Sequence, residues 1–559
     1  MNTLEALQDI ARLAQEGHLD EAQARCRTLL EKSPGNLDAH RLLGMILSNL
    51  GQFAEAVPHL KVLMQSGVMD ANVCYDLADA LTSSGQFAEA VAYYLQAIHL
   101  APDWPELHFN LGFVMQRLER HEQSAHSYSN ALRLRPDWLD AHNNLGLSLI
   151  ELDRPEEAAT HYRQVLALSP NHLYAMNNLG LALADLERFD EAIASYQRAL
   201  DMKPDYFEAH NNLGVSLLEL RRYDDALGAF RRASAINPSY NRAIFNEAVA
   251  LLSLGDLPDG FLKYESRWNT PKFPNQRPQL GCPQWLGDDN LSGKSIFIYA
   301  EQGLGDTLQF CRYLPLLAEK AAQVTAEVPA ELKDLLGTLP GRLSLVTPGG
   351  EPAGYDFHSP MCSLPLAFKT STATIPGVTP YLGAPRTAVD GFRDLQKTTG
   401  TLNVGICWRS GSRHRLMRKR DIPLAKLLTL TSTISAHQSI RLFSLQKDTT
   451  AAEQKLLADF GNITDVGSRF ADFSDTAAAL SCMDLVISVD TAVAHLCGAM
   501  GIPVWLMLMY SPDWRWLPDS AQSRWYPSVR LFRQAAIGAW DSVIGEITQA
   551  LPLFESKPH

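Results

Sequence analysis

The sequence has no long apolar run and no cysteine spacing typical of a metal site. Its longest apolar stretch, residues 502–510, is about half as long as a membrane-spanning helix. The first 20 residues carry Glu5, Asp9, Glu16 and Asp20 and lack an apolar core, so we expect no secretory signal. The eight cysteines include no Cys-x-x-Cys pair and are expected to be reduced. These absences predict a cytoplasmic protein without a transmembrane segment.

Positive charge is also scarce. The 49 basic residues are outnumbered by 62 acidic ones, which gives a formal net charge of -13. Binding to nucleic acid requires clustered Lys and Arg, so the composition argues against a nucleic-acid partner. An apolar content of 46% and a charged content of 20% are typical of globular proteins. A length of 559 residues is too great for one core and predicts three or four domains.

A 34-residue repeat fills the first half of the chain. Small residues let paired helices pack closely, and proline ends the second helix of a pair because it has no N–H. The pattern resembles the tetratricopeptide repeat, and it predicts an all-α superhelix over residues 1–268 with seven repeats and a degenerate eighth helix pair. The recurring positions are Ala22, Ala56, Ala90, Ser124, Ala158, Ala192 and Ala226; Gly44, Ala78, Gly112, Gly146, Gly180 and Gly214; and Pro34, Pro102, Pro136, Pro170, Pro204 and Pro238.

A row of asparagines follows the same interval in the first helix of each pair. A primary amide both donates and accepts hydrogen bonds, so a regular row of amides can pair with successive peptide groups of an extended chain. The row resembles the asparagine ladder of the eukaryotic O-GlcNAc transferase, which implies a polypeptide acceptor or partner protein in the groove. The alternative is that the amides serve packing or solvation. The row consists of Asn110, Asn144, Asn178, Asn212 and Asn246.

After the repeats, the pattern changes from helical to alternating strand and helix. Four prolines between residues 271 and 283 exclude regular structure and predict a linker over residues 269–294. Strands are predicted at 295–299, 323–328, 343–346, 402–408, 440–445, 485–489 and 504–508, and a helix at 307–320. The arrangement predicts two Rossmann-like α/β lobes, at 295–390 and 400–559, with a cleft between them.

The first candidate motif follows the first strand of the first lobe. Gly303 and Gly305 allow close approach of a ligand, and Asp306 is expected near the start of the next helix. A phosphate-binding P-loop is excluded because its Gly-Lys-Ser/Thr motif requires a lysine after the glycine, and here Asp306 follows Gly305. A dinucleotide fingerprint is excluded because Leu308 replaces its third glycine. Asp306 could instead only cap the helix, and Glu301 is a competing candidate base.

The second motif lies in the second lobe, where the apolar strand predicted at 485–489 leads into Asp490 and Thr491. The N–H groups at the start of the following helix form a potential diphosphate site. His495 follows Thr491 by four residues and therefore lies on the same helical face. A histidine that only fills the interior is the alternative.

The third motif, residues 405–424, is the most basic stretch of the chain. Ser410 and Gly411 suggest a phosphate-facing loop, to which Arg418 or Arg420 would add positive charge. Lys447, at the end of another predicted strand, could join them. The alternative is a solvated charged face.

Together, the three motifs resemble the lipopolysaccharide heptosyltransferase family (GT9-like) and its bacterial relatives that carry tetratricopeptide repeats. Residues 512–516 and 525–533 resemble those relatives as well. The resemblance implies a GT-B fold and an inverting transfer from a nucleotide sugar, with no metal or other cofactor. By this resemblance, Asp306 is the catalytic base, Thr491 and His495 hold the donor diphosphate, and Arg418 or Arg420 contacts phosphate. His358 is a candidate on the acceptor side.

One departure concerns the donor: Thr491-Ala-Val-Ala stands where heptosyltransferases have Ser-Gly-Pro-Met, so the identities of sugar and nucleotide stay open. The leading hypothesis is therefore a glycosyltransferase that modifies a protein side-chain hydroxyl. The alternatives are transfer to a lipid or polysaccharide, and a repeat scaffold with inactive transferase-like lobes.

Overall fold

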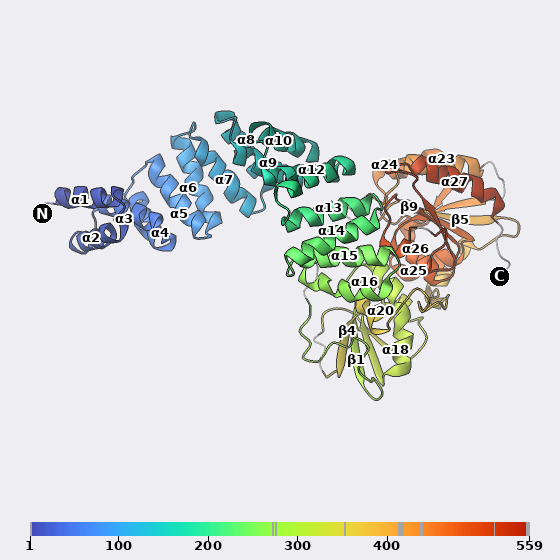
Figure 1. The fold of residues 1–559 in the computed structure, drawn as a ribbon. Helices are drawn as coiled ribbons and strands as arrows, with labels where there is room; N and C mark the ends of the chain where they lie inside the picture. The colour runs from blue at the N-terminus through green and yellow to red at the C-terminus, as the bar shows by residue number, and fades with distance from the viewer. Residues whose placement is uncertain are drawn as a thin grey trace. The chain divides into compact units, whose positions relative to one another are not determined.

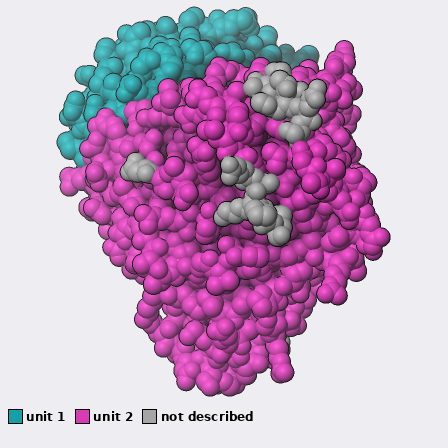
Figure 2. Space-filling model, turned by 90° about the vertical axis from the view of Figure 1, so that its right-hand side faces the viewer, with its two compact units in different colours: residues 1–204 teal, residues 205–559 magenta. Residues whose placement is uncertain are grey.

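The structure is a computed structural model that describes residues 3–270, 273, 277–350, 354–411, 419–435, 440–518 and 520–554. It divides into two compact units, residues 1–204 and residues 205–559, which Figure 2 shows in separate colours. The first unit consists of helices. The second combines further helices with two parallel sheets.

In the first unit, consecutive helices pack in pairs, as the 34-residue repeat predicts. Within the unit, the second helix of each pair also packs against the first helix of the following pair, so these repeats form one continuous stack. The helices are α1 (Thr3–Gln15), α2 (Leu19–Lys32), α3 (Leu37–Asn49), α4 (Phe53–Gln65), α5 (Ala71–Ser83), α6 (Phe87–Leu100), α7 (Pro105–Arg117), α8 (His121–Leu134), α9 (Leu139–Glu151), α10 (Pro155–Leu168), α11 (Leu173–Asp185) and α12 (Phe189–Met202).

The recurring glycines in the first helix of each pair have a packing role. A Cβ atom added to Gly112 would lie 2.9 Å from the Tyr128 ring, and one added to Gly180 would lie 2.4 Å from the Tyr196 ring. These distances are too short for any side chain, so the aromatic ring of the second helix packs directly on the backbone of the first. The sequence predicted this close approach.

The second unit begins with the last repeats: α13 (Phe207–Glu219), α14 (Tyr223–Ile236), α15 (Asn241–Ser253), the short α16 (Leu257–Tyr264) and the 3-10 turn η1 (Glu265–Asn269). The Phe261 ring of α16 lies 6.3 Å from that of Phe310 and 5.6 Å from that of Trp514. Arg221 donates a hydrogen bond to the carbonyl oxygen of Pro518 at 3.1 Å. The last repeats therefore belong to the core of the second unit, although the repeat pattern itself continues to residue 268.

The first sheet contains four parallel strands in the order β3-β2-β1-β4. They are β1 (Ser295–Tyr299), β2 (Gln323–Glu327), β3 (Leu343–Val346) and β4 (Phe357–Pro360). The sequence predicted the first three strands but not β4, which is short, polar and ends in proline. Around the sheet lie α17 (Leu304–Phe310), η2 (Cys311–Tyr313), α18 (Leu314–Lys320), α19 (Ala330–Leu336), η3 (Met361–Ser363) and α20 (Leu364–Ala367). The single helix predicted at 307–320 was wrong: α17, η2 and α18 take its place, and Pro315 lies in the first turn of α18, which begins at Leu314.

The second sheet contains six parallel strands in the order β10-β9-β8-β5-β6-β7. They are β5 (Leu402–Cys407), β6 (Ile440–Ser444), β7 (Ile463–Asp465), β8 (Leu485–Val489), β9 (Val504–Leu508) and β10 (Val529–Arg533). The sequence did not predict β7 and β10. The strand order reverses between β5 and β8, and in such sheets the crevice outside the carboxyl ends of these two strands is the usual ligand site.

Helices cover both faces of this sheet (Figure 1). Side chains of α23 (Leu424–Ser435), α24 (Ala451–Phe460) and α27 (Trp540–Ala550) share one apolar cluster with β5 and β8. Side chains of α25 (Phe473–Ser481) and α26 (Ala492–Ala499) pack on the other face. The remaining short elements are α21 (Arg386–Val389), η4 (Asp390–Leu395), η5 (Gly467–Arg469), η6 (Trp514–Trp516) and η7 (Leu551–Leu553). The second half therefore has the predicted α/β character.

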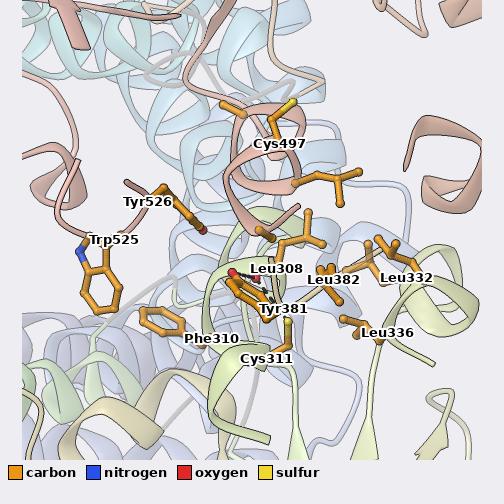
Figure 3. Close-up of a cluster of buried hydrophobic side chains, with 14 of the residues drawn as sticks. Leu308, Phe310, Cys311, Leu332, Leu336, Tyr381, Leu382, Cys497, Trp525 and Tyr526 are labelled. Atoms are coloured by element: carbon orange, nitrogen blue, oxygen red, sulfur yellow. Dashed lines mark hydrogen bonds between the residues drawn. The ribbon is translucent and has the colours of Figure 1, made fainter. Parts of the chain in front are cut away.

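One apolar cluster joins the two lobes. It includes Leu308, Phe310 and Cys311 from α17 and η2, Cys497 from α26, and Trp525 and Tyr526 from the segment before β10 (Figure 3). Because side chains from both lobes share this core, the helices that follow β1 and β8 are held next to each other. Within the described residues, no helix combines the length and the apolar character needed to cross a membrane.

Candidate functional site

The starts of helices α17 and α26 meet where the two lobes join. A Cβ atom on Gly305 would lie 3.0 Å from Cδ2 of His495 and 3.8 Å from Cα of Ala492. A methyl group at this position would require the His495 ring or α17 to shift by a few tenths of an ångström. The structure thus brings the first and second sequence motifs together, while the chemical roles assigned to them stay predictions.

Asp306 lies at this junction, in the first turn of α17. Its Oδ2 accepts a hydrogen bond from the backbone N–H of Gly303 at 3.0 Å, and its Oδ1 is ion-paired with Nη2 of Arg515. Gly303, not Asp306, is the N-cap residue. The carboxylate is nevertheless 22% exposed. Asp306 thus contributes to the helix start, as the alternative interpretation suggested, and also faces solvent at the junction.

Arg515, in η6, is the principal residue that the sequence analysis missed. Its Nη1 donates to Oδ1 of Asp513 at 2.8 Å and its Nε donates to Oε1 of Gln309. The guanidinium group stacks over the Trp514 ring at 4.3 Å and its side chain is only 8% exposed. Burial alone would lower the pKa of Arg515, but Asp513 and Asp306 raise it above its usual value. Its position between two tryptophans, in segment 514–516, is the sequence feature that could have pointed to this arginine.

A second arginine, Arg420, pairs with the carboxylate that follows β8. Its Nη1 lies 3.0 Å from Oδ2 of Asp490, and its Nη2 lies 3.6 Å from Oδ2 of Asp513. Burial raises the pKa of Asp490, while Arg420 opposes this rise. Asp490 in turn raises the pKa of Arg420. Arg418, the other arginine predicted to contact phosphate, lies outside the described residues.

The buried side chain of His495 lies beside these groups. Its Nδ1 is 2.9 Å from the Tyr526 hydroxyl, and its Nε2 is 3.9 Å from Oδ1 of Asp490. Burial, reinforced by the nearby Arg515, lowers the pKa of His495 to about 3. The imidazole is therefore neutral at physiological pH and can offer a ligand a hydrogen bond or an apolar surface, but no positive charge.

Thr491 is the N-cap residue of α26, but its side chain makes no capping hydrogen bond. Its hydroxyl lies 3.3 Å from that of Ser488 instead. The first N–H groups of α26 thus have no side-chain cap from Thr491, and they lie at the carboxyl end of β8, where the strand order reverses. This is a suitable place for an anionic group.

The loop after β5 reaches the same sheet edge. The backbone N–H of Ser410 donates to Oδ1 of Asp421 at 2.7 Å, and Gly411 is exposed where the described part of this loop ends. Lys447, after β6, donates from Nζ to the carbonyl oxygen of Ala471 at 2.8 Å. Lys447 is therefore engaged by the carbonyl group of the segment before α25.

Glu301 and His358 lie deeper in the first lobe. Glu301 is buried and accepts a hydrogen bond from Arg267 at 2.8 Å; burial raises its pKa and Arg267 opposes the rise. A buried ion pair of this kind leaves little access for a substrate hydroxyl. His358, on β4, is buried beside Tyr299 at a ring distance of 5.9 Å, and burial lowers its pKa. Its Nδ1 makes no hydrogen bond within the described residues.

The predicted asparagine row is present, and several of its amides bond to asparagines that directly precede a row position in the sequence. Asn178 donates to Asn143 at 3.0 Å in the first unit, and Asn246 donates to Asn211 at 2.8 Å in the second. Each bond links two neighbouring repeats. Asn110 donates to the Tyr75 hydroxyl at 3.4 Å. Asn143 and Asn211 also donate to the neighbouring row members Asn144 and Asn212, at 3.4 and 3.2 Å. Part of the hydrogen-bonding capacity of the row therefore serves packing between repeats.

Comparisons with known proteins concern mainly the helical part. Family models described as tetratricopeptide repeat match residues 13–73, 116–173, 143–206, 177–241 and 211–272, and a model described as TPR repeat matches residues 78–119. Protein FlbA of Caulobacter vibrioides is 26% identical over 324 residues, which cover 54% of this chain and 54% of FlbA. The chain thus spans about half the length of this curated relative.

Two solved structures match part of the chain as well. YrrB, a TPR protein, is 23% identical, with a TM-score of 0.30, over 33% of this chain and 95% of that chain. The C-terminal part of a TPR repeat-containing protein from Cytophaga hutchinsonii is 14% identical, with a TM-score of 0.37, over 43% of this chain and 98% of that chain. From the matched residues and the helix pairs of the structure, residues 13–272 are tetratricopeptide repeats, modules typical of proteins that bind peptides or partner proteins.

Proposed function

We propose that this chain is a GT-B glycosyltransferase related to the heptosyltransferases, in which the tetratricopeptide repeats hold a polypeptide acceptor. The observation that carries the proposal is the meeting of two helix starts from two parallel-sheet lobes, with Asp306 on one side and Arg420 and Arg515 on the other. A carboxylate opposite an anion-binding helix start supplies the two elements that sugar transfer from a diphosphate needs.

In the proposed reaction, Asp306 accepts the proton of the acceptor hydroxyl. The hydroxyl oxygen attacks the anomeric carbon from the side opposite the diphosphate. The bond between this carbon and the phosphate oxygen breaks, and its electron pair stays with the nucleoside diphosphate. Arg420 and the N–H groups at the start of α26 stabilise the charge that develops there. Because protein groups supply this stabilisation, we expect transfer to persist in EDTA.

The test compares Asp306→Asn with the wild type, by transfer and hydrolysis assays with UDP-, ADP- and GDP-sugars and protein acceptors. Loss of the general base should reduce the transfer rate by about 100-fold or more. Asp334→Asn, which changes an exposed carboxylate on α19, is the matched control and should keep full activity. Transfer by Asp306→Asn at the wild-type rate would refute the assignment of the base.

An interaction scaffold is the second candidate function. The specific observation in its favour is that both carboxylate oxygens of Asp306 are bonded within the protein. A scaffold would bind partner proteins through its repeats and show no turnover with any sugar nucleotide, even when nucleotides bind. If the acceptor were a lipid or polysaccharide instead, the chain would still be a glycosyltransferase. The repeats would then have a role other than holding the acceptor.

A further inference from the structure

The two arginines at the junction share their carboxylate partners. Asp513 lies between them, 2.8 Å from Arg515 and 3.6 Å from Arg420. With Asp306 and Asp490, three carboxylates surround two guanidinium groups, so the group as a whole is not positively charged. A diphosphate could enter this arrangement only if it replaced one of the carboxylates as a partner of an arginine.

The structure indicates which carboxylate can be replaced. Arg515 is fixed by Asp513, by Gln309 and by the face of Trp514. These contacts hold the guanidinium plane whether or not Asp306 is bonded to it. Asp306 is the most exposed acid of the group, at 22%, and the only one on the first lobe. Exchange at Asp306 therefore requires no movement of the arginine.

The exchange also has a chemical consequence. In the present arrangement, one oxygen of Asp306 accepts from Arg515 and the other from the N–H of Gly303. Oδ1 is therefore engaged by a donor of the protein rather than by a substrate hydroxyl. Release from Arg515 would free Oδ1 to accept the proton of a substrate hydroxyl.

We propose that the donor diphosphate displaces Asp306 from Arg515, so that Arg515 binds phosphate and donor binding releases the catalytic base. The proposal rests on the proposed function and adds to it a phosphate-binding residue and an order of events. Replacing a carboxylate by a phosphate oxygen leaves the buried guanidinium paired throughout, which avoids the cost of an uncompensated buried charge. An enzyme of this design keeps its base ion-paired until the donor is bound.

Competition for one arginine predicts reciprocal effects on affinity. Asp306→Asn removes the competing charge and should bind inorganic pyrophosphate and the preferred nucleoside diphosphate about tenfold more tightly than the wild type. Arg515→Gln should bind them about tenfold more weakly, and Arg515→Lys should lie between. In the double variant Asp306→Asn/Arg515→Gln, the increase in diphosphate affinity caused by Asp306→Asn should disappear. Arg524→Gln, at an exposed arginine later in the same lobe, is the control.

The experiment is isothermal calorimetry on the full chain with pyrophosphate, UDP, ADP and GDP, with circular dichroism to verify folding. If Arg515→Gln fails to fold, Asp306→Asn and Arg515→Lys still decide the question. The proposed exchange would be overturned if Asp306→Asn bound diphosphates no more tightly than the wild type. It would also be overturned if Asp306→Asn increased the affinity equally in the Arg515→Gln background. Binding that follows the predicted pattern without sugar transfer would refute the proposed function alone, whereas no binding of any diphosphate would refute both.

Discussion

At the scale of single residues, the junction depends on the absence of a side chain at Gly305. His495 and Ala492 stand so close that a methyl group would be 3.0 Å from the imidazole ring. His495 cannot easily move away, because it is bonded to Tyr526 and lies 5.3 Å from the Trp516 ring. The neutral, buried histidine therefore acts as a fixed surface against which α17 is positioned.

Gly305→Ala should consequently destabilise the second unit. We expect a loss of about 1–3 kcal/mol, the usual cost of overpacking a well-ordered contact. Urea unfolding monitored by tryptophan fluorescence would measure it. Gly383→Ala is the control, since a Cβ there meets no atom within 4 Å and the φ angle is not positive. Equal stability of both variants would mean that the contact between the helix starts is not maintained in solution.

The sequence identified only some of the residues at this site, for physical reasons. Gly305, Asp306, Asp490, Thr491 and His495 stand beside turns between strand and helix, where local patterns are informative. Arg515 contacts Asp306 across 209 residues, and no local pattern encodes that distance. Sequence position alone also could not show that Lys447 and Glu301 are bonded elsewhere, because such partners are set by tertiary packing.

At the scale of the elements, the repeat explains one unusual carboxylate. Asp76 on α5 stands 34 residues before Asn110 and so occupies the register of the asparagine row. Arg41, the cation that acts on it, is 3.1 Å from Asp70, and Asp79 adds further negative charge. Burial, only partly offset by Arg41, raises the pKa of Asp76 from 3.8 to about 6. A neutral amide would suit this position better.

This shift predicts a pH dependence of stability. Because the folded state binds the proton more tightly than the unfolded state, the stabilisation is complete below pH 3.8 and is lost as the pH rises through about 6. Relative to Asp76→Asn, the wild type should lose about 1–2 kcal/mol between pH 4 and pH 7, a value reduced for partial exposure. Urea unfolding of the full chain at several pH values would measure the difference.

Asp201→Asn is the control for this comparison, because Asp201 is exposed on α12. Its pH profile should follow that of the wild type. If Asp76→Asn also parallels the wild type between pH 4 and pH 7, Asp76 must find a cation in solution that the structure does not give it.

At the scale of the whole molecule, the repeats and the α/β lobes are not separated at the end of the repeat pattern. Leu252, Phe261 and Tyr264, from the last two repeat helices, share an apolar core with the lobes. The sequence could not reveal this, because the positions have the same residue types as an ordinary repeat interior. Arg267, just after α16, also supplies the buried partner of Glu301 at 2.8 Å.

Two N-terminal deletions distinguish the limits of the repeat pattern from those of the folded unit. A fragment of residues 205–559 retains the shared core and should unfold cooperatively and bind pyrophosphate as the full chain does. A fragment of residues 269–559 loses Phe261, Tyr264 and Arg267. Loss of Arg267 alone leaves Glu301 buried without its cation, at a cost of about 3–5 kcal/mol. We therefore expect the shorter fragment to aggregate or to lack cooperative unfolding in calorimetry. If it were as stable as the longer one, the last repeats would be mere neighbours of the lobes rather than part of their core.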